Sequence, residues 1–141
     1  MKTNKSHPIS VYILFFLLVF QGLSGTIGGL FLVIDPTGKL INLPLVFLEG
    51  SPFRDYFIPG LVLLILLGIF PLIVFYDLLR KKTWSWYGTL FVGLILVIWI
   101  ETEILIIGYQ SKPPLQAIYG LTAILIIIFN FMPSVRNYML T

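Results

Sequence analysis

Four long runs of apolar residues dominate the pattern of the chain. They cover about residues 9–34, 56–79, 84–109 and 115–132. A helix needs about 20 mainly apolar residues to cross a bilayer, and each run reaches or approaches that length. The runs are too long for barrel strands and lack the alternation of apolar and polar positions that such strands show. The pattern therefore predicts an all-α membrane protein, a four-transmembrane-helix bundle that forms a single integral membrane domain over residues 1–141.

The segment of about residues 35–55, between the first two runs, is the only long loop. Its first residues, Asp35-Pro36-Thr37-Gly38, are typical of a turn, because the Asp side chain can bond the backbone ahead and Pro presets the next φ. The apolar residues 43–48 are too few to span a bilayer, and we expect them to lie in the interface or to cap the bundle. Ser51-Pro52 predicts an N-cap and the first residue of the second long helix.

Composition excludes several classes of protein. Hydrophobic residues make up 58% of the chain and charged residues 11%, whereas soluble domains have about 45–50% apolar and about 25% charged residues. A soluble globular domain and a disordered chain are both excluded. The chain has no cysteine and one histidine, His7. Disulfides, thiolate chemistry, a histidine metal site and a catalytic triad within one chain are excluded as well, and we predict no cofactor and no metal site.

The basic residues predict the orientation in the membrane. Six lie before the first run, between the second and third runs, or after the fourth: Lys2, Lys5, Arg80, Lys81, Lys82 and Arg136. Three lie on the opposite side: Lys39, Arg54 and Lys112. By the positive-inside rule, the chain is a multi-pass protein of the plasma membrane with both termini in the cytoplasm. Topology thus accounts for the net charge of +3, and we expect no binding of nucleic acid.

The first run permits two further interpretations. Its start resembles a signal peptide, but apolar residues continue through Ile34, which favours an uncleaved span. Gly25 and Gly29 form a small-xxx-small pair, which lets two helix backbones approach closely. The partner helix is either another helix of the same bundle or belongs to a homodimer or a partner membrane subunit. Membrane lipids are the other partners that we expect.

Three residues within the runs predict local features of the helices. Pro71 lies in the middle of the second run and is expected to kink that helix. Gln21 and Asn130 are amides within the first and fourth runs. For both amides we expect hydrogen bonds between helices, each worth about 0.6 kcal/mol on average.

Glu101 and Glu103 carry the strongest chemical signal, because both lie inside the third run. A carboxylate in hydrocarbon costs about 2.5–3.5 kcal/mol on insertion scales, so such residues usually face a bundle interior, a cavity or a partner. Residues two apart on a helix are separated by about 200° around its axis. One carboxylate is therefore expected to point inward and the other to meet a neighbouring helix, the loop or the headgroups. Spacing alone leaves open which is which.

Other polar residues are expected at the same outward depth as the two carboxylates. Arg54 in particular could pair with a buried carboxylate through a bidentate hydrogen bond. The alternative to such a structural pair is a ligand site near the outward end of the bundle. The candidate ligand-binding residues are Glu101, Glu103, Arg54, Asp35, Asp55, Tyr109 and Gln116; none of them is assigned a catalytic role.

Two stretches of the chain resemble an uncharacterised family of small bacterial four-transmembrane-helix proteins. The first holds Asp35-Pro36-Thr37-Gly38, then residues 48–56 and Pro59-Gly60-Leu61, and the second holds residues 103–109 with Ser111 and Gln116. The resemblance implies a bacterial origin and four membrane helices, and it implies no activity.

Several hypotheses about function follow from these features. The first is binding of a lipid or small amphiphile in an outward-side pocket, which predicts a cavity with converging polar groups. The second is a non-catalytic accessory or scaffold subunit, which predicts a filled core. A lipid enzyme with a glutamate as general acid or base is a third, weaker hypothesis, since no nucleophile, metal cluster or phosphate-binding loop accompanies the carboxylates.

Overall fold

The computed structural model describes residues 8–108 and 115–140, and every regular element in these two ranges is helical. The elements are α1 (Ile9–Ile34), η1 (Lys39–Ile41), η2 (Leu45–Leu48), α2 (Phe57–Leu64), η3 (Ile65–Ile69), α3 (Phe70–Leu79), α4 (Trp84–Ile107), α5 (Leu115–Asn130) and α6 (Pro133–Leu140). The segments η1 and η2 are short 3₁₀ helices, and η3 is a π-helical turn that joins α2 to α3. The prediction of an all-α protein is confirmed for this part of the chain.

Among the described residues, three helices are long and apolar enough to cross a membrane, and the bent pair of α5 and α6 would be a fourth if it forms one span. The three are Ile9–Ile34, Phe57–Leu79 and Trp84–Ile106, of which the second comprises α2, η3 and α3. All three coincide with predicted runs. The last predicted run holds the shorter α5, and α6 follows it at an angle of 65°. The apolar pattern does not predict α6, because it is only eight residues long and several of its side chains are polar.

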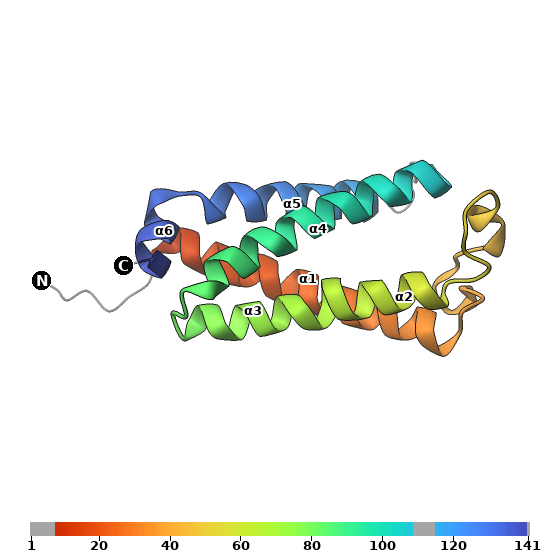
Figure 1. Cartoon of the computed structure of the whole chain (residues 1–141), viewed down its shortest axis with the longest axis horizontal. Coiled ribbons are helices and arrows are strands. Elements are labelled where there is room, and N and C mark those ends of the chain that lie inside the picture. Colours follow the sequence, from red (N-terminus) through yellow and green to blue (C-terminus); the bar gives the residue numbers. More distant parts are fainter. Residues whose placement is uncertain (1–7, 109–114, 141) are drawn as a thin grey trace, which may run out of the picture.

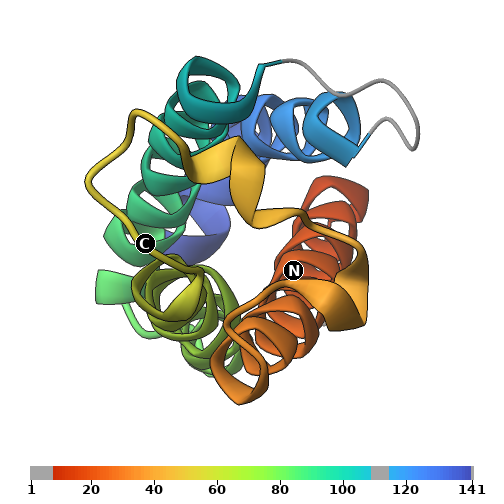
Figure 2. The same cartoon turned by 90° about the vertical axis from the view of Figure 1, so that its right-hand side faces the viewer.

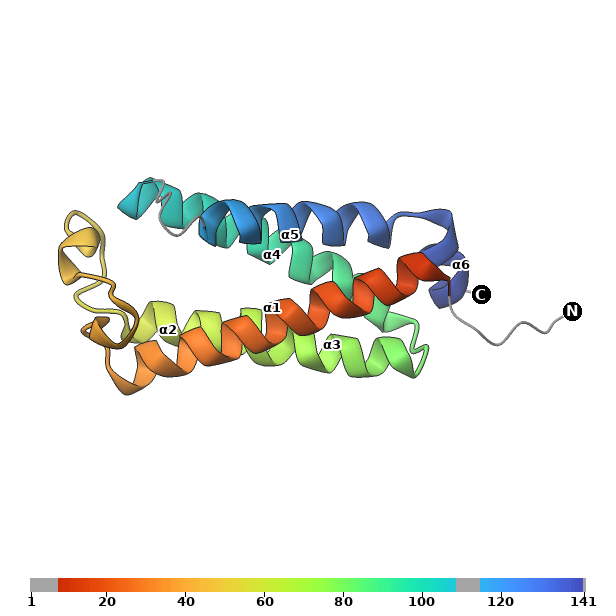
Figure 3. The same cartoon turned by 180° about the vertical axis from the view of Figure 1, so that it is seen from behind.

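The long helices lie side by side along one axis of the molecule (Figure 1). Helix α1 packs against α2, η3 and α3 on one side and against α5 on the other, and α4 packs against α3 and α5. The start of α1, the turn between α3 and α4, and α6 lie at one end, which we call the turn end (Figure 1). The segment of residues 35–56 lies at the opposite end, which we call the loop end (Figures 1 and 3).

The turn end has a filled core. Buried apolar side chains of α1, α3, α4, α5 and α6 form one cluster there. The Trp86 indole N–H donates to the backbone carbonyl of Asn130 at 2.7 Å, and the Asn130 side-chain amide donates to the carbonyl of Trp86 at 3.1 Å. The hydrogen bond between helices that we predict for Asn130 is thus confirmed. Lys81 Nζ lies 4.4 Å from the centre of the Tyr138 ring, so α6 is joined to the turn as well as to the core.

A seam of glycines joins α1 to the second span. A Cβ atom added to Gly25 would overlap with the carbonyl of Leu67, and one added to Gly29 would lie 2.6 Å from the Cα atom of Leu64. The backbones of α1 and the second span are therefore in direct contact at these two glycines. Small residues permit such close contact between membrane helices. The face of Gly25 and Gly29 is occupied within the chain, as the first of the two interpretations predicts. A homodimer or partner subunit at this pair stays a prediction.

Pro71 has no backbone N–H, and the second span is irregular just before it. The structure has a π-helical turn at Ile65–Ile69 just before Pro71, within the span of Phe57–Leu79, and the kink expected at Pro71 stays a prediction. Because proline cannot donate, the carbonyl of Leu67, four residues earlier, loses its α-helical hydrogen bond. Gln21 Nε2 of α1 donates to this carbonyl at 3.0 Å. The hydrogen bond between helices predicted for Gln21 is confirmed, and Pro71 explains its acceptor.

The loop end is held by its own hydrogen bonds. Asp35 Oδ1 accepts from the backbone N–H of Thr37 at 3.2 Å and from the Thr37 hydroxyl at 2.6 Å, which confirms the predicted turn. The Tyr56 hydroxyl donates to the carbonyl of Pro44 at 2.7 Å, and the Tyr56 N–H donates to the carbonyl of Pro36 at 2.9 Å. Tyr56 thus joins both parts of the loop to the start of α2.

The expectation that the second long helix begins at Pro52 is wrong. That helix begins at Phe57, whose backbone N–H donates to Asp55 Oδ1 at 3.0 Å. The Ser51 hydroxyl instead donates to the carbonyl of Leu48 at 2.7 Å and accepts from the Phe53 N–H at 3.2 Å. The same local hydrogen bonding that makes serine a good cap also stabilises turns, and here the turn forms.

Candidate functional site

A cavity of about 850 Å³ occupies the loop half of the molecule. Side chains of α1, the loop, α2, η3, α4 and α5 line it, and most of them are apolar. The pair α1–α2 and the pair α4–α5 diverge toward the loop end (Figures 1 and 3). Figure 2 looks onto this end and shows the loop crossing over the ring of helices. The cavity therefore lies between the two diverging pairs, beneath the loop.

The loop acts as the cover of the cavity. Leu43, Leu48 and Phe53 line the cavity from the loop side, whereas Leu45 and Val46 are exposed. Of the two positions that we expect for residues 43–48, the structure therefore favours the cap on the bundle. The cover is also anchored, since Leu48 and Tyr56 belong to a small buried cluster with Leu32 of α1.

Glu103 is the carboxylate that faces the cavity. Its side chain is half-buried and lines the cavity wall from α4. Glu103 Oε1 accepts from Gln116 Nε2 of α5 at 3.1 Å, and the same nitrogen donates to the carbonyl of Gly108 at 3.1 Å. The Trp99 side chain, one helical turn before Glu103, is a second hydrogen-bond partner of the carboxylate. Glu103 and Gln116, both candidates from the sequence, are thus brought together.

Glu101 lies on the other side of α4. Its side chain is exposed and does not line the cavity. This outcome matches the expectation that the two carboxylates cannot share one face, because they are separated by about 200° around the helix. The tertiary structure thus decides the alternative that spacing left open, and it places Glu103 inside.

The remaining candidate residues lie apart from the cavity. Arg54 and Asp55 are exposed in the loop, and within residues 8–108 and 115–140 no ion pair joins Arg54 to either glutamate. Asp55 holds the start of α2, and Asp35 holds its own turn, as described above. None of the three lines the cavity. Tyr109 lies outside the described residues.

Several cavity residues are missing from the set proposed from the sequence. Tyr56, Trp99 and Tyr119 line the cavity with their aromatic side chains, and Gln21 lines it from α1. Gln21 is 1% exposed, and its Oε1 atom has no hydrogen-bond partner among the described residues. A signal for Trp99 does exist in the sequence, because Trp99 and Glu103 are four residues apart and so lie on one helix face.

Tyr56 and Glu103 both line the cavity. Burial raises the pKa of the Tyr56 phenol above 10.0, and the negative charge of Glu103 raises this pKa further. The phenol is protonated at neutral pH in any case, and the raised pKa extends to more alkaline pH the range in which it can donate to Pro44. Tyr56 thus both holds the loop through its hydrogen bond to Pro44 and lines the cavity that Glu103 faces.

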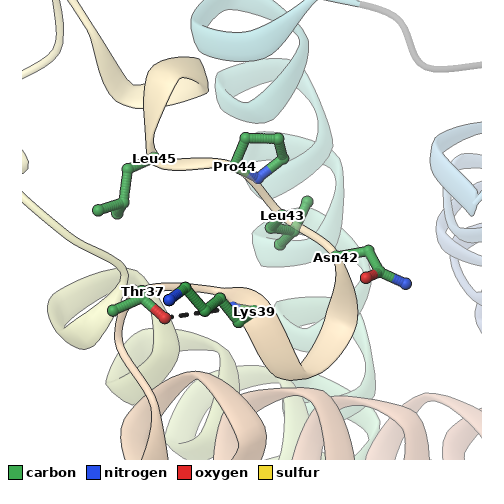
Figure 4. A pocket seen from close by; sticks show the side chains of 6 residues that line it. All are labelled: Thr37, Lys39, Asn42, Leu43, Pro44 and Leu45. Atoms are coloured by element: carbon green, nitrogen blue, oxygen red, sulfur yellow. Dashed lines mark hydrogen bonds between the residues drawn. The ribbon is translucent and has the colours of Figure 1, made fainter.

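A second hollow lies on the outer surface of the loop, among Thr37, Lys39, Asn42, Leu43, Pro44 and Leu45 (Figure 4). None of these six side chains is fully buried, and the hydrogen bond drawn there, from the Lys39 N–H to Thr37 Oγ1 at 3.4 Å, belongs to the turn itself. Within the described residues, no group of three or more His, Cys, Asp or Glu side chains could hold a metal ion. The cavity below the loop is therefore the candidate site.

Comparisons with models of protein families, with curated proteins and with solved structures find no match to this chain. The geometry of the cavity is therefore the basis for the function proposed below.

Proposed function

We propose that this chain is a binding protein of the bacterial inner membrane that holds a lipid or small amphiphile in the cavity beneath the loop. One observation carries the proposal: a cavity of about 850 Å³ with mainly apolar walls and a single carboxylate, Glu103, near its covered end. Ligand cavities of proteins have volumes of about 300–1,000 Å³ and combine apolar walls with a few placed polar groups. This cavity has both properties.

The position of the cavity favours a ligand from the membrane. Ile27 and Phe31 of α1 and Ile98 of α4 line the cavity, yet their side chains are also exposed on the outside of the helices. Apolar side chains at the edges of the cavity allow a hydrocarbon chain to pass between helices from the bilayer. The accessory-subunit hypothesis predicts a filled core. Buried clusters occur in both halves of the molecule, but in the loop half they lie beside a cavity of about 850 Å³.

The proposal includes four spans in a four-helix bundle. In this topology α5 is the fourth span, and α6 turns away from it along the cytoplasmic face. The exposed cations Arg80, Lys81, Lys82 and Arg136 all belong to the turn end, which the positive-inside rule assigns to the cytoplasm. The loop then covers the cavity from the outer side of the membrane.

Filling the cavity tests the proposal. A Cβ atom added to Gly28 would meet only the end of the Leu63 side chain, at 3.4 Å, and Gly28 lines the cavity. The phenyl ring of Gly28→Phe should therefore fill space in the cavity that the ligand would occupy, and α1 should still fold. We expect mass spectrometry of the protein purified in mild detergent to find a defined lipid or amphiphile on the wild type and to find it lost from Gly28→Phe.

Gly120→Phe is the matched control. Gly120 lies on α5 outside the cavity, with no atom within 4 Å of an added Cβ, so this variant should retain the compound. Thermal unfolding of all three proteins establishes that they are folded. If the same bulk phospholipids are found on all three proteins, the proposal is wrong and the accessory-subunit hypothesis becomes the better one.

A further inference from the structure

Among residues 8–108 and 115–140, the Glu103 carboxylate has no cationic partner. No Lys, Arg or His side chain of these residues lines the cavity, and none of them forms an ion pair with Glu103. Its partners are the N–H groups of Gln116 and Trp99. These donors orient the carboxylate but leave its charge without a counter-charge.

A charge in such surroundings selects among ligands. Burying a charge without a counter-charge is costly, and the cost falls when an opposite charge comes within a few ångströms. A cationic ligand would supply that charge, whereas a carboxylate or phosphate on the ligand would be repelled by Glu103. The cavity is therefore more favourable to cationic than to anionic amphiphiles.

The aromatic residues of the cavity support the same conclusion independently. Tyr56, Trp99 and Tyr119 line it together with Phe31 and Phe53. Aromatic faces attract cations through the ring quadrupole, and Trp and Tyr do so in the sites that bind alkylated ammonium groups. Tyr56 lies near enough to Glu103 to respond to its charge. Tyr56 and Trp99 thus line the same cavity as the Glu103 carboxylate, whereas the ring of Tyr119 is stacked on Phe20 with 5.5 Å between the ring centroids.

The rest of the cavity fits a hydrocarbon chain. By helical rise, Glu103 lies about 6 Å below the loop end of α4, and Gln21 lies about 20 Å below the loop end of α1. Residues of both helices between these levels line the cavity, and most of them are apolar. A ligand with its charged group at Glu103 therefore has space for a chain directed toward Gln21.

We propose that the ligand is an amphiphile with an ammonium group, which binds at Glu103 among the aromatic side chains while its hydrocarbon chain lies along the apolar walls. This inference rests on the proposed function, because it names the class of ligand for the same cavity. It also predicts that the matching alcohol binds more weakly and that the matching carboxylate binds most weakly.

Three probes of one chain length test the inference: dodecyltrimethylammonium, 1-dodecanol and dodecanoate. Each is added to the full-length protein in alkyl maltoside micelles, and native mass spectrometry measures the bound fraction as a function of probe concentration. The proteins are the wild type, Glu103→Gln and Glu101→Gln. The two variants remove one negative charge each from the same helix, and only Glu103 faces the cavity. All three proteins meet the same free concentration of a given probe, so partition into micelles cancels when the preference for one probe over another is compared between the proteins.

We expect the preference for the ammonium probe over the alcohol to be at least about tenfold greater in the wild type and in Glu101→Gln than in Glu103→Gln, which is the effect of a hydrogen-bonded or paired charge. Glu103→Gln should lose this preference, still bind the alcohol, and gain affinity for dodecanoate. An equal effect of both variants, or an ammonium preference that persists in Glu103→Gln, overturns the inference alone. If Gly28→Phe binds all three probes as well as the wild type does, the cavity is not the binding site and the proposed function fails too.

Discussion

At the scale of single residues, Glu101 and Glu103 show how position decides the role of a side chain. The two residues are chemically identical and two positions apart. Helix geometry predicts that they face different ways, but the neighbours of α4 decide which one is enclosed. Gln116 lies against Glu103, and Glu101 is exposed. Only the packing of α5 on α4 makes this distinction.

The pair of Gln21 and Pro71 leads to a prediction at the same scale. Gln21→Leu should lower the free energy of unfolding by about 1 kcal/mol, because the buried carbonyl of Leu67 then has no donor. In a Pro71→Ala background the same substitution should cost less, since the N–H of residue 71 can donate to Leu67 within the helix. Unfolding of the four proteins in micelles gives the coupling between the two positions.

The control for this cycle is Gln21→Leu combined with a substitution at an exposed loop position outside the clusters, such as Val46→Ala. The effects of distant, independent sites are additive, so this combination should show no coupling. A cost of Gln21→Leu that is the same with proline or alanine at position 71 contradicts the explanation of the Leu67 carbonyl.

At the scale of the element, α1 uses two faces for two tasks. Gly22, Gly25 and Gly29 are in contact with the second span, where an added Cβ would overlap with atoms of η3, α2 or α3. Gln21, Ser24 and Gly28 line the cavity, and Gly25 borders it as well. One stripe of small residues thus brings two backbones together, and the neighbouring stripe leaves space open. The sequence shows small residues in both stripes and does not distinguish their roles.

A glycine in close contact with another backbone and a glycine in open surroundings should respond differently to replacement by alanine. Gly25→Ala should lower the free energy of unfolding by about 1–3 kcal/mol, because its methyl group would overlap with the Leu67 backbone, which cannot move aside easily. Gly120→Ala should be neutral or stabilise the protein by up to about 1 kcal/mol, since that position is open and alanine favours the helix. Unfolding in the same detergent measures both. A similar response at the two positions contradicts the close contact at Gly25.

At the scale of the whole molecule, the two ends are built differently. The turn end has a continuous apolar core in which Trp86 and Asn130 exchange hydrogen bonds. At the loop end the helices diverge, and the cavity lies beside two smaller buried clusters. We expect the packed core of the turn end to hold the helices in place, and we expect the ligand to enter at the loop end.

The proposed orientation predicts which end is reached from outside the cell. The chain has no cysteine, so a single introduced cysteine reports its own position. Val46 in the loop and Thr83 in the turn are both exposed and uncharged, and replacing either leaves the charge pattern unchanged. A membrane-impermeant maleimide should label Val46→Cys in intact cells and should label Thr83→Cys only after the cells are opened. The reverse pattern would show that the loop faces the cytoplasm.

The sequence by itself determined the class of the protein and the helical segments. Apolar runs of this length must satisfy their backbone hydrogen bonds internally in a membrane, and only helices do so one segment at a time. For this reason the ranges of α1, of Phe57–Leu79 and of α4 were predictable to within about two residues. Local chemistry was equally predictable where it depends on near neighbours, as in the turn of Asp35 with Thr37.

The tertiary structure alone decided the site. Arg54, Asp35 and Asp55 are close to the outward depth of Glu103, yet none of them lines the cavity. Gln21, Tyr56 and Tyr119 come from other elements and do line it. Depth along a helix follows from sequence position, but the direction of a side chain toward a cavity depends on how the helices pack and where they diverge. The divergence results from contacts between segments far apart in the chain, and no local pattern encodes those contacts.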